Sequence, residues 1–135
     1  MGKMGTYLKN KILDYVYSKA EFTPATTLYM GLSTTTISAD GGNITEPTGN
    51  GYARVAVTNN ATNFPAASSG AKSNGVDISF ITPTGDWGEV TDFFLTDAET
   101  GDGNFYGGGA LASPQTINSG NIVTFKAGDL DISLT

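Results

Sequence analysis

The spacing of apolar residues changes once along this 135-residue chain, at Thr23-Pro24, and this change constrains the fold more than any other feature. Before it, apolar residues recur three and four positions apart, which is typical of one face of a helix. After it, apolar and polar residues alternate, which is typical of strands that bury one face. The residue before a proline disfavours the helical region, so a helix cannot continue through this point. The sequence therefore predicts one N-terminal helix followed by β structure.

The first segment predicts a helix over about residues 6–20, with Thr6 as its N-cap. The apolar side chains on its face are Leu8, Ile12, Tyr15 and Val16. A helix of about three turns is only marginally stable by itself in water, so this face must pack against another surface. The rest of the chain is the expected surface, and a neighbouring subunit is the alternative.

Seven short segments after residue 26 have the pattern of strands. They are 28–32, 53–57, 76–80, 87–95, 105–111, 122–126 and 130–134. Turn signals such as Asp102-Gly103 separate several of them, and no helical pattern lies between them to connect parallel strands. We therefore predict a single domain over 1–135. It is mainly β, an antiparallel sandwich or barrel-like sheet of about seven strands over 26–135, with one N-terminal α-helix.

Two polar segments, 33–51 and 59–72, are too long for hairpin turns. Loops of this length in a small domain are usually functional or become ordered against a partner. Partner contact is the prediction, because Phe64-Pro65 in the second loop would otherwise be exposed, and an ordinary surface loop is the alternative.

Two features of the predicted strands indicate close packing on both faces of the sheet. Phe93 and Phe94 are adjacent, and adjacent strand residues point to opposite faces. One ring therefore belongs to the core, and the other needs a second buried surface, either the helix or another subunit. The run Gly107-Gly108-Gly109 removes side chains where another backbone or an aromatic ring comes close.

The chain contains no cysteine and no histidine. It therefore lacks the residues for thiolate nucleophiles, histidine general bases, Ser-His-Asp triads and Cys/His zinc sites. We expect no enzymatic activity, no cofactor and no metal. The acidic stretch Asp97–Asn104 leaves one question open: its oxygen ligands suit calcium, and its place between two strands suits an acidic hairpin turn.

Charge is distributed unevenly along the chain. Residues 1–21 carry four lysines against two acids, a net charge of +2, and residues 22–135 carry three cations against eleven acids, a net charge of −8. A body with this excess of acidic residues repels phosphate, and we therefore expect no nucleic-acid binding. We also expect no membrane contact, because no apolar run approaches the ~18 residues of a membrane span. Lys9 and Lys11 could meet an acidic neighbour; a solvated helix face is the alternative.

Several short motifs follow one another along the chain. They are Gly51-Tyr52-Ala53-Arg54, Ala71-Lys72-Ser73-Asn74, Trp87-Gly88-Glu89-Val90-Thr91, Asp97-Ala98, Gly109-Ala110-Leu111 and Ala127-Gly128-Asp129-Leu130-Asp131-Ile132. As an ordered set they resemble small virion structural proteins of tailed bacteriophages, which include proteins labelled tail fibre proteins and capsid cement or decoration subunits. The resemblance runs from the N-terminal helix to the last strand.

The resemblance implies a non-enzymatic structural subunit that is assembled in the host cytoplasm and then carried on the extracellular virion. The expected role is capsid decoration or cement that binds and stabilises the head surface. A tail fibre or tail-tip component is the alternative, and so is a receptor- or glycan-binding module, for which Trp87 beside Asp86 is the one hint.

The expected partners are the major capsid protein or the tail proteins of the virion, together with further copies of the chain. The resemblance makes a trimer the expected homo-oligomer. The residues expected to contact a subunit or partner are Lys9, Lys11, Phe64, Phe93 and Phe94.

Overall fold

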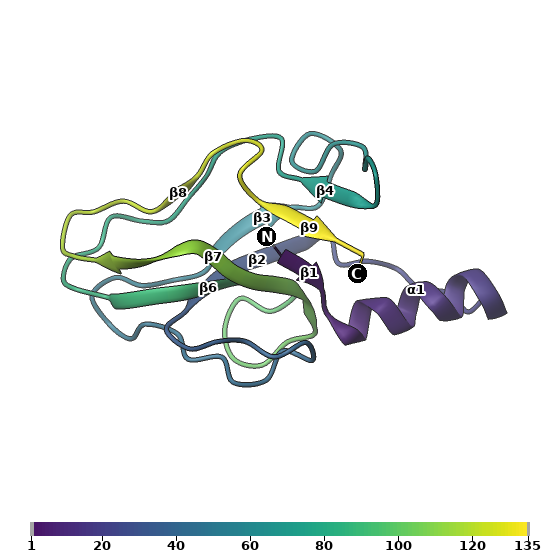
Figure 1. The fold of residues 1–135 in the computed structure, drawn as a ribbon, viewed down its shortest axis with the longest axis horizontal. Coiled ribbons are helices and arrows are strands. Elements are labelled where there is room, and N and C mark those ends of the chain that lie inside the picture. The colour runs from purple at the N-terminus through teal and green to yellow at the C-terminus, as the bar shows by residue number, and fades with distance from the viewer. Residues whose placement is uncertain (1, 135) are drawn as a thin grey trace.

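The computed structural model describes residues 2–134 and contains one helix and nine strands among them. The helix is α1 (Thr6–Ser18). The strands are β1 (Gly2–Met4), β2 (Thr27–Ser33), β3 (Val55–Thr58), β4 (Ala71–Ser73), β5 (Ile78–Ser79), β6 (Gly88–Thr96), β7 (Phe105–Ile117), β8 (Thr124–Phe125) and β9 (Asp131–Ser133). Figure 1 shows the strands gathered into a body from which α1 projects. The predicted class, mainly β with one N-terminal helix, is confirmed.

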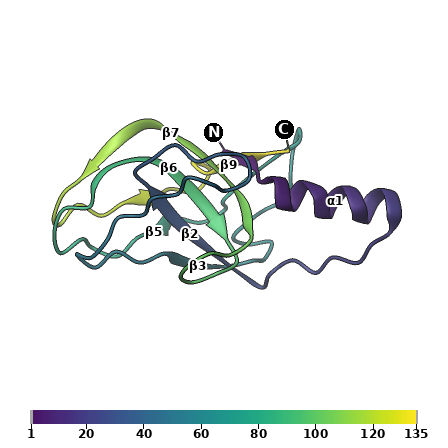
Figure 2. The ribbon, with the colours of Figure 1, turned by 90° about the horizontal axis from the view of Figure 1, so that it is seen from below.

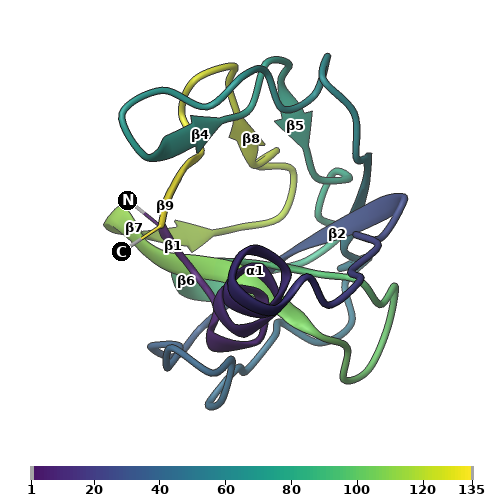
Figure 3. The ribbon, with the colours of Figure 1, turned by 90° about the vertical axis from the view of Figure 1, so that its right-hand side faces the viewer.

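Seven of the strands form one curled sheet in the order β3-β2-β6-β7-β1-β9-β4, and β5 and β8 pair separately (Figure 3). Neighbours in the large sheet run antiparallel except β1 and β9, which are parallel and join the two ends of the chain. The alternation pattern did not indicate this pairing, because it joins residues that are 130 positions apart along the chain, Gly2 with Ile132 and Lys3 with Ser133.

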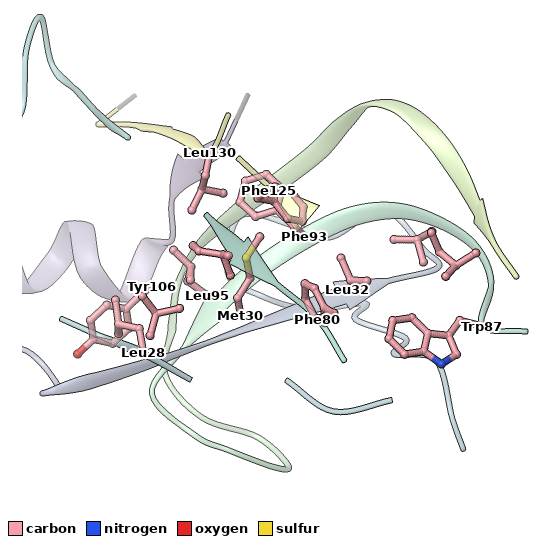
Figure 4. Packing of buried hydrophobic residues seen from close by; sticks show 14 residues of the cluster. Leu28, Met30, Leu32, Phe80, Trp87, Phe93, Leu95, Tyr106, Phe125 and Leu130 are labelled. Atoms are coloured by element: carbon pink, nitrogen blue, oxygen red, sulfur yellow. The ribbon is translucent and has the colours of Figure 1, made fainter. Parts of the chain in front are cut away.

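The hydrophobic core lies between the large sheet and the β5–β8 pair (Figure 4). Met30 and Leu32 from β2 and Phe93 and Leu95 from β6 are at most 2 % exposed. Phe125 from β8 packs on the ring of Phe93, with the two centroids 5.8 Å apart. The period-2 pattern of these strands therefore marks the faces that are buried, as expected for strands with one side on a core.

One residue of β6 departs from simple alternation. Counting from Phe93 places Val90 on the opposite face, yet Val90 is buried in the same core cluster as Phe93. The pairing register between β6 and β7 shifts between Val90 and Asp92, and such a bulge reverses the side-chain alternation beyond it. Strict alternation along β6, which would turn Val90 away from Phe93, therefore does not hold at this position.

Strands β1 and β4 were not predicted. Each has only three residues and no apolar alternation, and β4 begins inside the segment predicted as the loop 59–72. Their place in the sheet depends on β7 and β9, with which they pair. A side-chain carbon on Gly107 would lie 2.7 Å from the carbonyl oxygen of Lys3 in β1, and one on Gly108 would clash with the carbonyl oxygen of Phe93. The predicted close approach of backbone at this glycine run is confirmed.

The helix is shorter than predicted and has a different cap. It begins at Thr6, with Gly5 in the N-cap position and no capping side chain, so the prediction of Thr6 as N-cap is wrong. It ends at Ser18, and Lys19 adopts the left-handed conformation with φ 54°. Residues 19–26 then return to β2 (Figure 2).

The loop 33–51 is ordered by contacts within the chain. Ser33, which is fully buried, accepts a hydrogen bond at Oγ from the backbone N–H of Thr45, and Thr34 donates its own N–H to the carbonyl of Thr45. The buried carboxylate of Asp92 accepts a hydrogen bond from the backbone N–H of Ile37. These contacts hold the loop against the face of the large sheet that lies opposite the core.

Candidate functional site

An apolar groove runs between α1 and the body and encloses about 480 Å³. Leu8, Ile12 and Tyr15 of α1 form one wall. Core residues form the floor, namely Leu28, Leu95, Tyr106 and Leu130. Phe64, Ala67, strand β4 and the end of β9 form the opposite wall. Lys72 is the one charged residue that lines the groove. A pocket of this size and apolarity is suited to binding hydrophobic side chains.

The helix beside the groove has apolar side chains on a second face. No residue of α1 is buried. Leu13, Val16 and Tyr17 are 52 %, 59 % and 82 % exposed. Large apolar side chains that are exposed together on one element are typical of a protein–protein contact surface. In this chain only the first turns of α1 pack on the body, where Tyr7 contacts the rings of Phe22 and Tyr106.

The residues expected to contact a partner fall into two groups. Lys9 and Lys11 lie half-buried on α1, with the Lys11 ammonium 5.7 Å from the ring centre of Tyr7. Phe64 is half-buried and lines the groove. These three residues lie on or beside the surface that one copy of the chain leaves open, and whether a partner touches them stays a prediction.

Phe93 and Phe94 form the second group, and both rings are at most 1 % exposed within a single copy. The prediction that they point to opposite faces agrees with the structure, because Phe93 belongs to the core cluster and Phe94 does not. The choice of the helix or another subunit as the cover for the second ring is wrong. Arg54 lies over Phe94, and the loops around 40–46 and 101–103 surround the same region.

Arg54 is the centre of this covering layer. Its guanidinium lies 5.1 Å from the centre of the Phe94 ring and forms two hydrogen bonds with the Glu46 carboxylate, at 3.0 and 2.9 Å. It also donates to the carbonyl oxygens of Ala98 and Gly101. These bonds connect the loop 33–51, the start of β3 and the β6–β7 turn. Charge asymmetry alone gave no sign of this role for Arg54.

Two groups in this layer have shifted pKa values. The hydrogen bonds with Glu46 raise the pKa of the Arg54 guanidinium, so it stays charged. Burial raises the pKa of the Tyr52 hydroxyl well above its ordinary value, and that hydroxyl donates to Glu46 at 2.7 Å while accepting from the backbone N–H of Leu32. Both shifts favour the protonated states in which the observed hydrogen bonds form.

The motifs that carry the resemblance meet in structural contacts of this kind. Arg54 of the first motif binds Ala98 of the Asp97-Ala98 motif. Asn74, which is 2 % exposed, accepts at Oδ1 from the backbone N–H groups of Gly128 and Leu130. Each contact fixes one loop on another, so these residues specify the fold.

Trp87 and the acidic stretch do not form the sites that were considered for them. Trp87 is 5 % exposed, and its indole N–H donates to the carbonyl of Asn50, so the ring is unavailable for stacking on a glycan. The carboxylate of Asp97 accepts two hydrogen bonds from Asn104, which closes the β6–β7 turn. Within residues 2–134, no three acidic side chains gather as a metal site would need.

A second, polar pocket of about 490 Å³ lies over Phe94, between the loops around 40–46 and 101–103. Thr96 faces this region, and its hydroxyl is the one buried side-chain polar atom of the described residues without a hydrogen-bond partner. A side-chain carbon on Gly103 would lie 2.5 Å from that hydroxyl, so Gly103 covers it.

No helix within the described part of the chain is long and apolar enough to cross a membrane.

Comparison with known protein families places this geometry in context. A family model described as Gp80, podophage GP4 fiber I protein gp80, matches residues 3–133. No curated protein matches the chain. The matched range extends from β1 to β9 and includes α1, the groove and the Arg54 cluster.

Proposed function

The chain belongs to the family of the podophage GP4 fiber I protein gp80, a family of phage structural proteins, and we propose that it is a non-enzymatic subunit of a fibre-type appendage on the virion. The observation that carries this proposal is the extent of the family match, which includes nearly the whole chain. The absence of cysteine and histidine from the sequence and the structural use of its motif residues support a role without catalysis.

The groove and α1 are the proposed means of attachment. The body is rigidified by loop contacts on one face and a packed core on the other. The exposed apolar side chains are concentrated on α1, which projects from that body (Figure 1). Exposed apolar patches of this kind mark sites of protein–protein interaction. We therefore propose virion proteins, including further copies of the chain, as its partners.

A capsid decoration subunit is the second candidate. The observation in its favour is that residues 2–134 form one compact β body with a single 13-residue helix, without the repeats or coiled-coil stalk typical of long fibres. Both candidates place the protein on the particle, and they differ in where it is bound.

Gold-labelled antibody on purified particles separates the two candidates. Label confined to the tail is the expected result. Label spread over the head would replace the fibre proposal with capsid decoration. Particles without label, from a lysate in which the antibody detects the protein, would contradict both.

A further inference from the structure

We propose that the apolar groove between α1 and the body binds a short acidic segment of another virion protein, which inserts one or two large apolar side chains. This inference rests on the proposed function for the identity of the partner as a virion protein. It deepens that function by naming the chemistry that the partner presents to the groove.

The first step is the arrangement of side chains around β9. Leu130, Ile132 and Leu134 occupy alternate positions of one extended segment, and all three line the groove. Lys72 of β4 pairs with Ile132, and residues directly opposite each other in two strands point to the same face. Asp131 lies between the alternating apolar residues, so its carboxylate points to the other face. The lining of the groove therefore contains a cation and no carboxylate.

The second step is that the charge of Lys72 is not neutralised within the described residues. The one ion pair of residues 2–134 joins Arg54 and Glu46. The ammonium of Lys72 therefore has no carboxylate partner among them. An unpaired cation at the wall of an apolar groove favours an occupant that carries a negative charge.

The third step is that α1 adds positive charge beside the groove. At 100° per residue, Lys11 lies about 40° from Tyr15 on the helix circumference, and Lys9 lies about 60° from Ile12 on the other side. Tyr15 and Ile12 line the groove, so the two lysines flank its helical wall. The chain as a whole has a net charge of −6, so this positive region is a local exception. An acidic segment fits it, and a basic segment would be repelled.

The fourth step is the size of the groove. Its volume of about 480 Å³ lies within the range of about 300–1,000 Å³ that is typical of sites for small ligands. Such a volume receives a few side chains and not the whole face of a helix or a sheet. Binding energy at a protein interface is commonly concentrated in one or two anchor side chains that fill a pocket. An extended segment can supply them, because its alternate side chains point to one side.

The test is an NMR titration of the full chain with the peptide acetyl-Asp-Leu-Ser-Leu-Asp-amide. Saturable shifts are expected at the amides of Lys72, Ile132 and Tyr15. The same peptide with alanine in place of both leucines should bind at least tenfold more weakly, because each buried methylene tightens binding about fourfold. The peptide with lysine in place of both aspartates should bind several-fold more weakly. Added salt should narrow that difference, because exposed charges are screened beyond ~10 Å at 0.1 M.

Two variants with matched controls test the assigned residues. Lys72→Glu should weaken binding of the aspartate peptide by about two- to fivefold and strengthen binding of the lysine peptide, whereas Lys126→Glu makes the same charge change outside the groove. Tyr15→Ala removes part of the helical wall and should weaken both peptides, whereas Tyr17→Ala makes the same change on α1 at a residue that does not line the groove. All four side chains are exposed, so the fold should tolerate the changes, and thermal unfolding checks this.

Three results of the titration would overturn the proposal. They are the absence of saturable shifts at the groove, equal binding of the aspartate and lysine peptides, and binding by Lys72→Glu equal to that of Lys126→Glu. Sedimentation velocity provides a fourth: a wild type that self-associates and is dissociated by the peptide would show that a second copy occupies the groove. Failure of the peptide to bind a protein that is present on purified particles would overturn this inference and leave the proposed function in place.

Discussion

Arg54 joins three segments that lie far apart in the sequence. Its side chain is 7 % exposed and pairs with Glu46, while its guanidinium covers the ring of Phe94. Removal of this side chain leaves a partly buried carboxylate without its cation and two carbonyl oxygens without donors. We expect Arg54→Ala to lower the free energy of unfolding by about 2–4 kcal/mol. Chemical denaturation measures this value. The exposed cation Lys126 gives the control, and a loss as small as that of Lys126→Ala would contradict the role given to Arg54.

Tyr52 predicts a dependence of stability on alkaline pH. Burial raises the pKa of its hydroxyl in the folded state, whereas in the unfolded chain it ionises near pH ~10. Above that pH the unfolded state has lost a proton that the folded state keeps, so stability falls as pH rises, by about 1.4 kcal/mol per pH unit for one such tyrosine. Below pH ~10 this contribution is fully present.

Denaturation of the wild type and of Tyr52→Phe between pH 8 and pH 11 tests the assignment, with these pH values chosen to bracket the ordinary tyrosine pKa of about 10. Above pH ~10 the free energy of unfolding should fall less steeply with pH in the variant, by about 1.4 kcal/mol per pH unit, the contribution of one such tyrosine. Some slope should remain, because burial also raises the pKa of Tyr106. Equal slopes in the two proteins would show that Tyr52 does not titrate in this way.

At the residue scale, the direction of a side chain can be predicted where the strand period alone decides it. The opposite directions of Phe93 and Phe94 follow from strand geometry alone. The cover over Phe94 could not be predicted, because it depends on the pairing of Arg54 with Glu46 across the conformation of a long loop. The burial of Trp87 could not be predicted either, because it depends on the long loop that carries Asn50, whose carbonyl accepts the indole hydrogen bond.

At the scale of elements, α1 carries the prediction about attachment. Lys9 and Lys11 lie half-buried on α1, which also carries several large exposed apolar side chains, and the charge pattern of the sequence predicts that they meet an acidic neighbour. The double reversal Lys9→Glu with Lys11→Glu should reduce the number of copies retained on purified particles, and retention by the wild type should fall with added salt, because exposed charges are screened beyond ~10 Å at 0.1 M. Particle-bound protein is measured by quantitative immunoblot.

The reversal Lys126→Glu changes the charge of the body at an exposed position away from α1 and serves as the control. Occupancy of the Lys9 and Lys11 variant equal to that of this control would leave the two lysines as ordinary solvated residues of the helix.

The strands show how far an element can be predicted from its own residues. Segments with clear alternation, such as those of β2 and β6, were located within one or two residues. Strands β1 and β4 were missed because their hydrogen-bonding partners define them, and the bulge in β6 was missed because it depends on the register with β7. The helix ends several residues before the proline signal, because Lys19 adopts the left-handed conformation and the backbone N–H of Ala20 donates to the carbonyl of Asp14.

At the scale of the whole molecule, the fold class and the phage family could be predicted from periodicity and from the ordered motifs. The groove could not, because it arises where α1, β4 and β9 meet, and β4 and β9 are strands of only three residues at one end of the sheet order. Composition contributed the charge asymmetry between the helix segment and the body. The structure adds the surfaces on which that asymmetry can act.

Mass spectrometry of gradient-purified phage particles tests the central claim, that this chain is a structural subunit of the virion, most directly. The account predicts that the protein co-purifies with the particles in a fixed ratio to the major capsid protein, and that this ratio is unchanged from one gradient fraction to the next. A protein that is abundant in the infected lysate but absent from the particle fractions, or present there in a varying ratio, would contradict the account.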